Sequence, residues 1–266
     1  MIRLAITGAT GRMGRCVLEL VAGDGRFCIE AALTGPHDPL SGKTLRVGDA
    51  DIPIVERYEG ACDVLVDFSL PTGTIAWLDD CQRRRIPMVI GVTGHDDAQT
   101  ARIRAVARDI PIVLAANFSV GVNAVLGLLG PLARALGNGY DIEIVETHHK
   151  HKVDAPSGTA LAIVDEISRG NSTVAPRSKE SADLVFGRQG KTGERPAGQI
   201  GVHAVRMGEI IGQHEIHFSG CGETITIRHT AHSRESFVAG ALRAAAWIVG
   251  RDAGLYSMRD VLRADH

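Results

Sequence analysis

The side chains best suited to acid–base chemistry are concentrated between Glu146 and Thr159. Three histidines and two lysines fill the five consecutive positions 148–152, out of eleven histidines in the whole chain. Histidine exchanges a proton near neutral pH, and a lysine ammonium group attracts a carboxylate as a point charge. Because crowded cations repel one another, this stretch favours a site that binds an anion and transfers protons.

A helix is predicted to begin directly after this stretch, at Ser157-Gly158-Thr159, and to run to about Arg169. The first turn of a helix presents free backbone N–H groups and a partial positive charge, and Thr159 adds a hydroxyl. Gly158 allows an anion to approach the backbone closely. The helix start is therefore a second candidate carboxylate site, and two such sites with acid–base groups between them suit a small dicarboxylate substrate.

Three other interpretations are open for residues 148–152. A metal site has imidazoles available, but the ammonium groups of Lys150 and Lys152 disfavour a dication, so we expect no metal. A nucleic-acid patch would be longer, with interleaved aromatic residues, and would not be expected in a chain of net charge -2, so we expect no nucleic-acid partner. The third interpretation is a solvated surface loop.

A glycine-rich turn is predicted near the start of the chain, between a strand at residues 2–7 and a helix at residues 16–21. Strand, glycine turn and helix in this order are the context of a dinucleotide-binding fingerprint. Gly8 permits the tight turn, Gly11 lets a pyrophosphate approach the backbone, and Gly14 lets the helix pack closely on the strand. A glycine-rich turn that binds no nucleotide is the alternative.

Further strand–helix units predict that this half is an open parallel sheet, in which ligands bind beyond the carboxyl ends of the strands. Gly91–Gly94 and Ala115–Ser119 follow two of these strands, so we expect them at the same edge as the glycine turn. The first lets a nicotinamide approach the backbone, and Asn117 can hydrogen-bond its carboxamide; ordinary polar loops are the alternative. The predicted strands are 27–33, 63–68, 87–92 and 110–116, and the predicted helices begin at Ser69 and span 96–108.

The end of the second strand decides between NAD and NADP in folds of this kind. An acidic residue there binds the ribose 2′-hydroxyl, whereas a basic residue accommodates a 2′-phosphate. Residues 34–37 read Thr-Gly-Pro-His, neither acidic nor arginine, while Lys43 and Arg46 lie further along the loop. The sequence leaves the choice open, and we expect NADH or NADPH as the cofactor.

The composition of the chain changes near residue 120, where alternating strands and helices give way to a β-rich meander. We therefore predict an α/β protein with a Rossmann-type dinucleotide-binding domain (1–119 and 230–266) and a C-terminal α+β domain (120–229). Residues 171–199 lack a clear period and are predicted to form a long loop, functional or mobile. The remaining predicted elements are helix 121–136, strands 140–147, 199–206, 209–218 and 223–229, and helix 233–250.

Composition places the chain among soluble proteins. Its 266 residues are 44% hydrophobic and 23% charged, close to globular averages. We expect no leader and no apolar run near the ~18 residues that span a bilayer, hence a cytoplasmic protein without a membrane partner. Five irregularly spaced cysteines are expected to be reduced thiols. They are Cys16, Cys28, Cys62, Cys81 and Cys221.

These motifs together resemble the 4-hydroxy-tetrahydrodipicolinate reductase family, formerly called dihydrodipicolinate reductase, of the diaminopimelate route to lysine. The resemblance runs from end to end of the chain and is most specific in the histidine–lysine string, followed by Pro-Ser-Gly-Thr. The other matching segments are Gly8–Gly14, Gly91–Gly94, Ala115–Gly121, Thr192–Arg195, Ser233-Arg234 and Met258–Leu262.

The resemblance implies a Rossmann-type domain and an α+β domain with an open mixed sheet, assembled as a homotetramer through that sheet. It implies NAD(P)H-dependent reduction of a cyclic dicarboxylate imine. His148 would be the proton donor and acceptor, Lys152 the proton donor and His149 a substrate contact, while Gly158 and Thr159 would hold a carboxylate. The implied cofactor-binding residues are Gly8, Ala9, Thr10, Gly11, Arg12, Met13, Gly91, Val92, Thr93, Ala115, Ala116, Asn117 and Phe118.

The chain departs from the family pattern at the cofactor end. Family members often carry Glu-Arg after the second strand, where this chain has Thr34-Gly35, and Val92 replaces a frequent threonine. Dual use of NADH and NADPH is therefore an expectation. Two other classes are open: a Rossmann reductase for a different dicarboxylate, and a non-catalytic dinucleotide sensor, which would have no need of the acid–base cluster.

Overall fold

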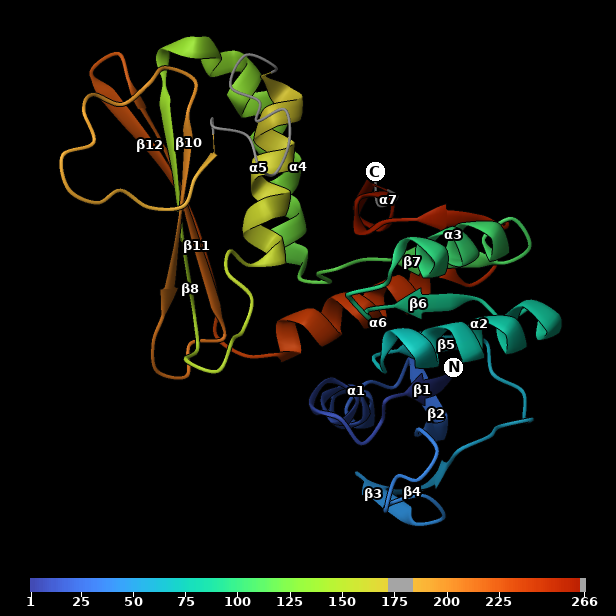
Figure 1. Cartoon of the computed structure of the whole chain (residues 1–266). Helices are drawn as coiled ribbons and strands as arrows, with labels where there is room; N and C mark the ends of the chain where they lie inside the picture. Colours follow the sequence, from blue (N-terminus) through green and yellow to red (C-terminus); the bar gives the residue numbers. More distant parts are fainter. Residues whose placement is uncertain (172–183, 264–266) are drawn as a thin grey trace. The chain divides into compact units, whose positions relative to one another are not determined.

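The chain forms two compact units in the computed structural model, which describes residues 1–171 and 184–263 (Figure 1). The first unit contains residues 1–120 and 234–266, and the second contains residues 121–233. Each unit has its own sheet and its own buried apolar core.

The first unit is built on one predominantly parallel sheet in the order β13-β7-β6-β5-β1-β2-β4-β3. Every neighbouring pair is parallel except β3 and β4, which form an antiparallel hairpin at one edge. The strand order reverses between β1 and β5, as in doubly wound nucleotide-binding sheets. The strands are β1 (Ile2–Thr7), β2 (Phe27–Leu33), β3 (Thr44–Val47), β4 (Ala50–Val55), β5 (Val64–Asp67), β6 (Met88–Ile90), β7 (Pro111–Leu114) and β13 (Gly254–Tyr256).

Helices cover both faces of this parallel sheet (Figure 1). One core contains side chains of α1 (Arg12–Ala22), α6 (Glu235–Ile248) and α7 (Met258–Arg263). The core on the other face contains side chains of α2 (Pro71–Arg84) and α3 (Asp97–Val106). Because both faces are covered, the central strands are apolar throughout, and every residue of β5 is buried. The predicted Rossmann-type fold is confirmed.

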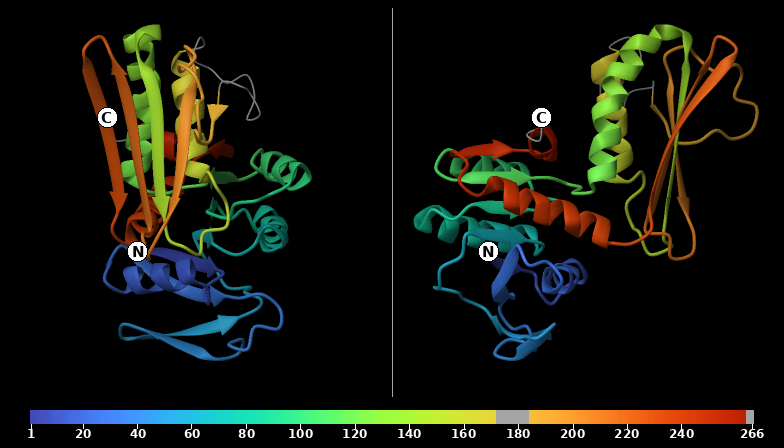
Figure 2. Two further views of the ribbon diagram at one scale, coloured as in Figure 1. Left: turned by 60° about the vertical axis from the view of Figure 1, so that its left-hand side comes forward. Right: turned by 180° about the vertical axis from the view of Figure 1, so that it is seen from behind.

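The second unit is a mixed sheet with two helices on one face, which both views in Figure 2 show. Its order is β12-β11-β8-β10-β9, in which β8, β9 and β10 run parallel and β11 is antiparallel to both β8 and β12. The predicted open mixed sheet is confirmed. Its elements are α4 (Val120–Leu136), the 3-10 turn η1 (Gly137–Gly139), β8 (Asp141–His148), α5 (Gly158–Gly170), β9 (Leu184–Val185), β10 (Ile200–Arg206), β11 (Gly212–Gly220) and β12 (Glu223–Ala231).

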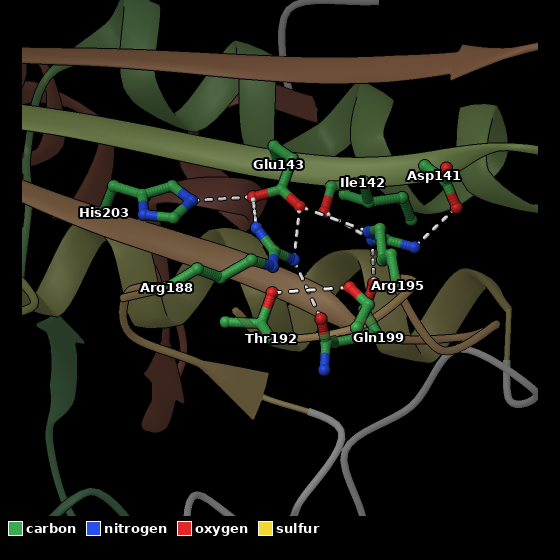
Figure 3. A network of polar contacts seen from close by, with 9 residues as sticks. Asp141, Ile142, Glu143, Arg188, Thr192, Arg195, Gln199 and His203 are labelled. Carbon is green, nitrogen blue, oxygen red and sulfur yellow. Dashed lines mark hydrogen bonds and ion pairs between the residues drawn. The ribbon is translucent and has the colours of Figure 1, made fainter. Parts of the chain in front are cut away.

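The opposite face of the mixed sheet carries a polar network centred on Glu143 (Figure 3). Its carboxylate accepts hydrogen bonds from Arg188 (2.8 and 3.2 Å), Arg195 (3.2 Å) and His203 (2.7 Å). Although burial alone would raise the pKa of Glu143, these donors lower it to about 2. Gly201, paired with Glu143 across β10 and β8, leaves the space that the carboxylate occupies. The arginines thereby hold the described part of the 171–199 loop against the sheet; residues 172–183 lie outside the described residues.

Helix α4 corrects one expectation from the sequence. Within the described residues, Val120–Gly139 is long and apolar enough to cross a membrane by length and composition alone, although no apolar run of that length was expected. Leu129 and Ala133 on this helix are buried in the core of the second unit together with α5 and the sheet. A helix that packs on the sheet of its own unit has a structural reason to be apolar on that side.

Several short elements were not predicted from the sequence. The β3–β4 hairpin, β13 and α7 were missed, and β9 interrupts the predicted long loop. The strand predicted at 209–218 begins only at Gly212 because Gly208, with φ 50°, and the residues after it form the turn from β10. These elements are two to six residues long, too short for a periodic pattern to appear.

Close packing of α4 on α5 makes a testable prediction about two helical glycines. A Cβ at Gly170 would lie 2.1 Å from the Gly130 carbonyl oxygen, whereas a Cβ at Gly127 would meet nothing within 4 Å. We expect Gly170→Ala to lower the free energy of unfolding by roughly 1–3 kcal/mol through overpacking. The control Gly127→Ala should leave it unchanged or raise it by up to about 1 kcal/mol, because alanine is the better helix former. Chemical denaturation measures both, and equal effects would contradict this packing.

Candidate active site

The predicted acid–base residues lie at the carboxyl end of β8. Successive side chains of a strand alternate between its faces, so Glu146 and His148 point to the same side. His148 Nδ1 lies 2.5 Å from Glu146 Oε2, and both side chains are buried. Because a carboxylate can only accept a hydrogen bond, Nδ1 carries the proton and Nε2 is the nitrogen left to exchange one.

Glu146 is a fully buried carboxylate whose oxygens are held by several elements. The guanidinium of Arg206 donates to both oxygens at 2.8 Å, and the backbone N–H of Ser157 donates at 3.0 Å. Burial alone would raise the pKa of Glu146, but the hydrogen bonds from His148 and Arg206 lower it to about 2. Glu146 therefore stays ionised at any physiological pH, and its charge is matched by that of Arg206.

Strand register brings these partners together. Arg206 ends β10 and pairs with His148 across the parallel β8–β10 ladder, while His214 on β11 pairs with Glu146 across the antiparallel ladder. The ring of His214 contacts that of His148 edge to face, with centroids 5.3 Å apart. A Cβ at Gly212 would lie 3.1 Å from His148 Nε2, so the glycine at the start of β11 leaves room beside this nitrogen.

His214 and Ser157 fix the start of α5. Ser157 is the N-cap: its Oγ accepts from the Ala160 N–H at 3.1 Å and lies 3.1 Å from His214 Nε2. Burial, with the neighbouring His148 adding to the effect, lowers the pKa of His214 to about 4. A neutral imidazole can accept the one proton of the serine hydroxyl, which leaves the oxygen free to cap the helix.

The loop from His149 to Pro156 and the first turn of α5 hold the other predicted site residues. Lys152 donates to Asp154 at 2.7 Å, and its side chain is mostly buried. Gly158 is exposed at the helix start, and a Cβ there would meet nothing within 4 Å. The packing of the chain therefore does not require glycine at this position, and the space over the backbone N–H groups is open to a ligand. Thr159 and His214 line one small cavity.

Gly8, Gly11 and Gly14 form a cradle at the carboxyl end of the central strand β1. Gly8 has φ +66°, and a Cβ there would lie 2.4 Å from the Phe68 carbonyl oxygen. A Cβ at Gly14 would lie 2.2 Å from the Gly8 carbonyl oxygen, so close helix–strand packing requires glycine here. Helix α1 begins after Gly11 without a side-chain cap. Its first N–H groups are of the kind that binds a phosphate, so this cradle fits a dinucleotide.

The other predicted cofactor residues follow β6 and β7 of the same sheet. A Cβ at Gly91 would lie 2.2 Å from the ring of Phe68, and Phe68 in turn contacts Phe118 edge to face, with centroids 6.2 Å apart. Asn117 Oδ1 accepts from the Ser119 N–H at 2.9 Å, which shapes the turn after β7. These segments thus lie in the same unit as the glycine turn, because all three follow the carboxyl ends of strands in one parallel sheet.

Sequence reasoning missed functional-site neighbours in both units. Arg206 and His214 lie in strands about 60 residues beyond Glu146, and only strand pairing reveals them. Asp67, fully buried at the end of β5, accepts hydrogen bonds from Thr7, Ser69 and Thr74. The sequence signal that could have identified Asp67 is an acidic residue at the end of a buried strand.

A metal centre finds no support in the part of the chain that the structure describes. Among those residues, no group of three or more histidine, cysteine, aspartate or glutamate side chains is arranged to hold an ion. The five cysteines are free thiols.

Known proteins match this chain over nearly its whole length. Residues 2–118 match the family described as "Dihydrodipicolinate reductase, N-terminus", and residues 121–262 match "Dihydrodipicolinate reductase, C-terminus". The 4-hydroxy-tetrahydrodipicolinate reductases of Thiobacillus denitrificans and Alkalilimnicola ehrlichii are 46% and 43% identical to this chain, over 98% of each protein. A dipicolinate-bound dihydrodipicolinate reductase from Paenisporosarcina sp. TG-14 has a TM-score of 0.71 at 25% identity, covering 97% of each chain.

A doubly wound unit with a glycine cradle, joined to a mixed-sheet unit with a buried histidine–carboxylate pair, is the arrangement of an oxidoreductase that uses a nicotinamide cofactor. Both family matches and the full-length relatives specify which one: the chain belongs to the dihydrodipicolinate reductase family.

Buried His214 predicts how stability depends on pH. Its pKa is about 4 in the folded protein and about 6.5 in an unfolded chain, so between these values only the unfolded chain takes up a proton. The contribution of His214 to the free energy of unfolding is therefore fully present above pH 6.5. As the pH falls from 6.5 towards 4, this free energy decreases by roughly 3 kcal/mol. We expect His214→Gln to flatten the fall in unfolding free energy across this window.

The control is His217→Gln on the same strand, whose side chain hydrogen-bonds Thr226 and is partly exposed. It should retain the slope of the parent protein. Urea denaturation at half-unit pH steps measures the slopes, and an unchanged slope in His214→Gln would contradict the buried, neutral state of His214.

Proposed function

We propose that this protein reduces 4-hydroxy-tetrahydrodipicolinate to tetrahydrodipicolinate with NADH or NADPH, in the diaminopimelate route to lysine. The names of relatives that match 98% of this chain support the substrate. The observation that carries the proposal is the buried Glu146–His148 pair beside the open N-terminus of α5. It combines a proton-exchanging group with a carboxylate site, which reduction of a dicarboxylate requires.

The second unit binds the substrate in this proposal. One carboxylate of the substrate lies over the backbone N–H groups of Gly158 and Thr159, where the helix dipole favours negative charge. Lys152 and His149 contact the substrate, with the ammonium group of Lys152 available as a proton donor once the substrate displaces Asp154 from it. His148 takes up and releases a proton at Nε2, since Nδ1 is held by Glu146.

The first unit binds the cofactor. The diphosphate lies at the N-terminus of α1 over residues 8–13, and the segments 91–93 and 115–118 hold the nicotinamide end. The cofactor supplies the hydride that reduces the substrate. The role of the chain's own residues is to orient both molecules and to exclude water.

We further propose a cytoplasmic homotetramer that assembles through the mixed sheet. Helices α4 and α5 cover one face of that sheet within the unit, and a second copy would pack on the other face, which carries Glu143 and the loop arginines bonded to it. Light scattering coupled to size-exclusion chromatography tests this assembly, and a monomer at micromolar concentration would exclude it.

The decisive experiment follows the oxidation of NADH and NADPH in parallel, with substrate generated freshly by the preceding synthase reaction. Turnover with this substrate supports the proposal. Turnover only with another cyclic dicarboxylate imine would reassign the substrate, and nucleotide binding without any hydride transfer would identify a dinucleotide sensor instead.

Lys152 makes the sharpest prediction about catalysis. We expect Lys152→Ala to lower kcat by about 10²–10⁴-fold, the usual effect of losing one acid–base group. The matched control is Lys150→Ala, two positions from Lys152 in the chain. Lys150 is exposed beside Glu209, so kcat of this variant should fall by less than about threefold. Steady-state kinetics of both variants tests the assignment, and near-normal turnover of Lys152→Ala would refute it.

A further inference from the structure

A carboxylate lies between the glycine turn and the end of β2. Asp38 Oδ2 accepts hydrogen bonds from the Thr10 hydroxyl at 2.7 Å and from the Thr34 hydroxyl at 2.5 Å, and Oδ1 accepts from the Leu40 N–H at 2.9 Å. Thr10 belongs to the proposed phosphate-binding turn, and Thr34 directly follows β2. Asp38 is thus joined to both segments that flank the adenosine ribose in a doubly wound fold.

We propose that Asp38 is the specificity-determining residue for the cofactor: its carboxylate accepts a hydrogen bond from the ribose 2′-hydroxyl and disfavours a 2′-phosphate, so that this enzyme prefers NADH to NADPH. The inference rests on the proposed function, because it concerns the nucleotide that serves that reaction. Position 34, directly after β2, is a threonine here. Asp38 supplies the acid from four residues further along and is held there by Thr34 itself.

The charge on Asp38 is secured by its surroundings. Hydrogen bonds from Thr34, Leu40 and Thr10, with a smaller contribution from nearby Arg15, lower the pKa of the carboxyl. An ionised carboxylate cannot donate a hydrogen bond to a phosphate and repels its charge. Oδ1 keeps one acceptor position beyond its bond to Leu40, which a ribose hydroxyl can fill.

A cavity beside Thr34, the residue whose hydroxyl bonds Asp38, is large enough for an adenosine. It has a volume of about 320 Å³ and is lined by Gly8, Thr34, Gly35 and the indole of Trp77. Its charged lining residues are mainly acidic, with Arg57 as the one cation. A cavity of this charge favours the less anionic of the two cofactors. The acidic residues are Glu56, Glu59 and Asp80.

Gly35 offers an independent test of the same cavity. A Cβ at Gly35 would meet nothing within 4 Å, and its backbone does not require glycine, so a longer side chain fits without strain. An arginine at this position would place a guanidinium beside the ribose, where it can bind a 2′-phosphate. Gly35→Arg therefore adds the attraction for NADPH while leaving the carboxylate of Asp38 in place.

The test measures dissociation constants of NADH and NADPH by energy transfer from tryptophan to the bound nicotinamide, for the full-length protein and four variants: Asp38→Asn, Gly35→Arg, the two combined, and a control. We expect the parent to bind NADH on the order of tenfold or more tightly than NADPH. Asp38→Asn should reduce that ratio at least fivefold by strengthening NADPH binding, and Asp38→Asn combined with Gly35→Arg should invert it. The control Asp51→Asn removes the same charge on β4, where Asp51 is exposed and bonded to Arg46, and should leave the ratio unchanged.

The outcomes separate the inference from the proposed function. If Asp38→Asn weakens both nucleotides equally, Asp38 only shapes its turn through the Leu40 N–H, and the inference is overturned. Should Asp38→Asn fail to fold, the single variant Gly35→Arg decides. We expect Gly35→Arg to gain affinity for NADPH but still to bind NADH more tightly, because the carboxylate of Asp38 still opposes the phosphate. If Gly35→Arg alone binds NADPH more tightly than NADH, the inference is overturned. If the parent binds neither nucleotide, the proposed function itself is wrong.

Discussion

The candidate active site depends on one buried ion, the carboxylate of Glu146. Moving an isolated carboxylate out of water costs far more free energy than a small protein can spare, so Glu146 is stable only while its hydrogen-bond donors are in place. Those donors come from three elements: Arg206 from β10, the Ser157 N–H from the start of α5, and His148 from β8 itself. The requirement to satisfy one charge therefore fixes the positions of a strand end, a helix end and an imidazole.

The contacts of Ser157 extend this constraint to the N-terminus of α5, the proposed carboxylate site. Ser157 bonds Glu146 through its backbone and His214 through its hydroxyl, while the same hydroxyl caps the helix. A displacement of α5 would break both bonds to the sheet, the one to Glu146 and the one to His214. The helix N-terminus and the His148 ring are thus held in one arrangement, and in the proposed function this would lower the entropy cost of binding the substrate.

Local chemistry was readable from the sequence where the residues are neighbours in the chain. The histidine–lysine string, the serine at a helix start and the glycine turn each carry their own signal, and the doubly wound fold follows from alternating strands and helices. Arg206 and His214 carry no such signal, because an arginine at a strand end and a histidine in an alternating strand are ordinary features. Their roles arise from the register of three strands, which short-range patterns do not encode.

Asp38 shows the same limit at a shorter range. The second strand ends at Leu33, and the four residues directly after it, 34–37, include no acid. The positive φ of His37 (69°) turns the chain back, so that Asp38 reaches the hydroxyl of Thr34. A left-handed residue other than glycine is uncommon and difficult to anticipate from composition. The direction of the turn, rather than the identity of the residues, determines which side chain reaches Thr34 at the end of β2.

The charge balance of the site also bears on the proposed binding of a doubly charged substrate. Arg206 already matches the charge of Glu146, so the buried cluster is neutral while His148 is neutral. In the proposed reaction, a dicarboxylate substrate would bring its negative charge beside Lys152 and the N-terminus of α5, both of which favour an anion. Because Arg206 already pairs with Glu146, no unpaired carboxylate repels that substrate from the site. The arginine therefore leaves the positive charge of Lys152 and of the helix N-terminus to act on the substrate.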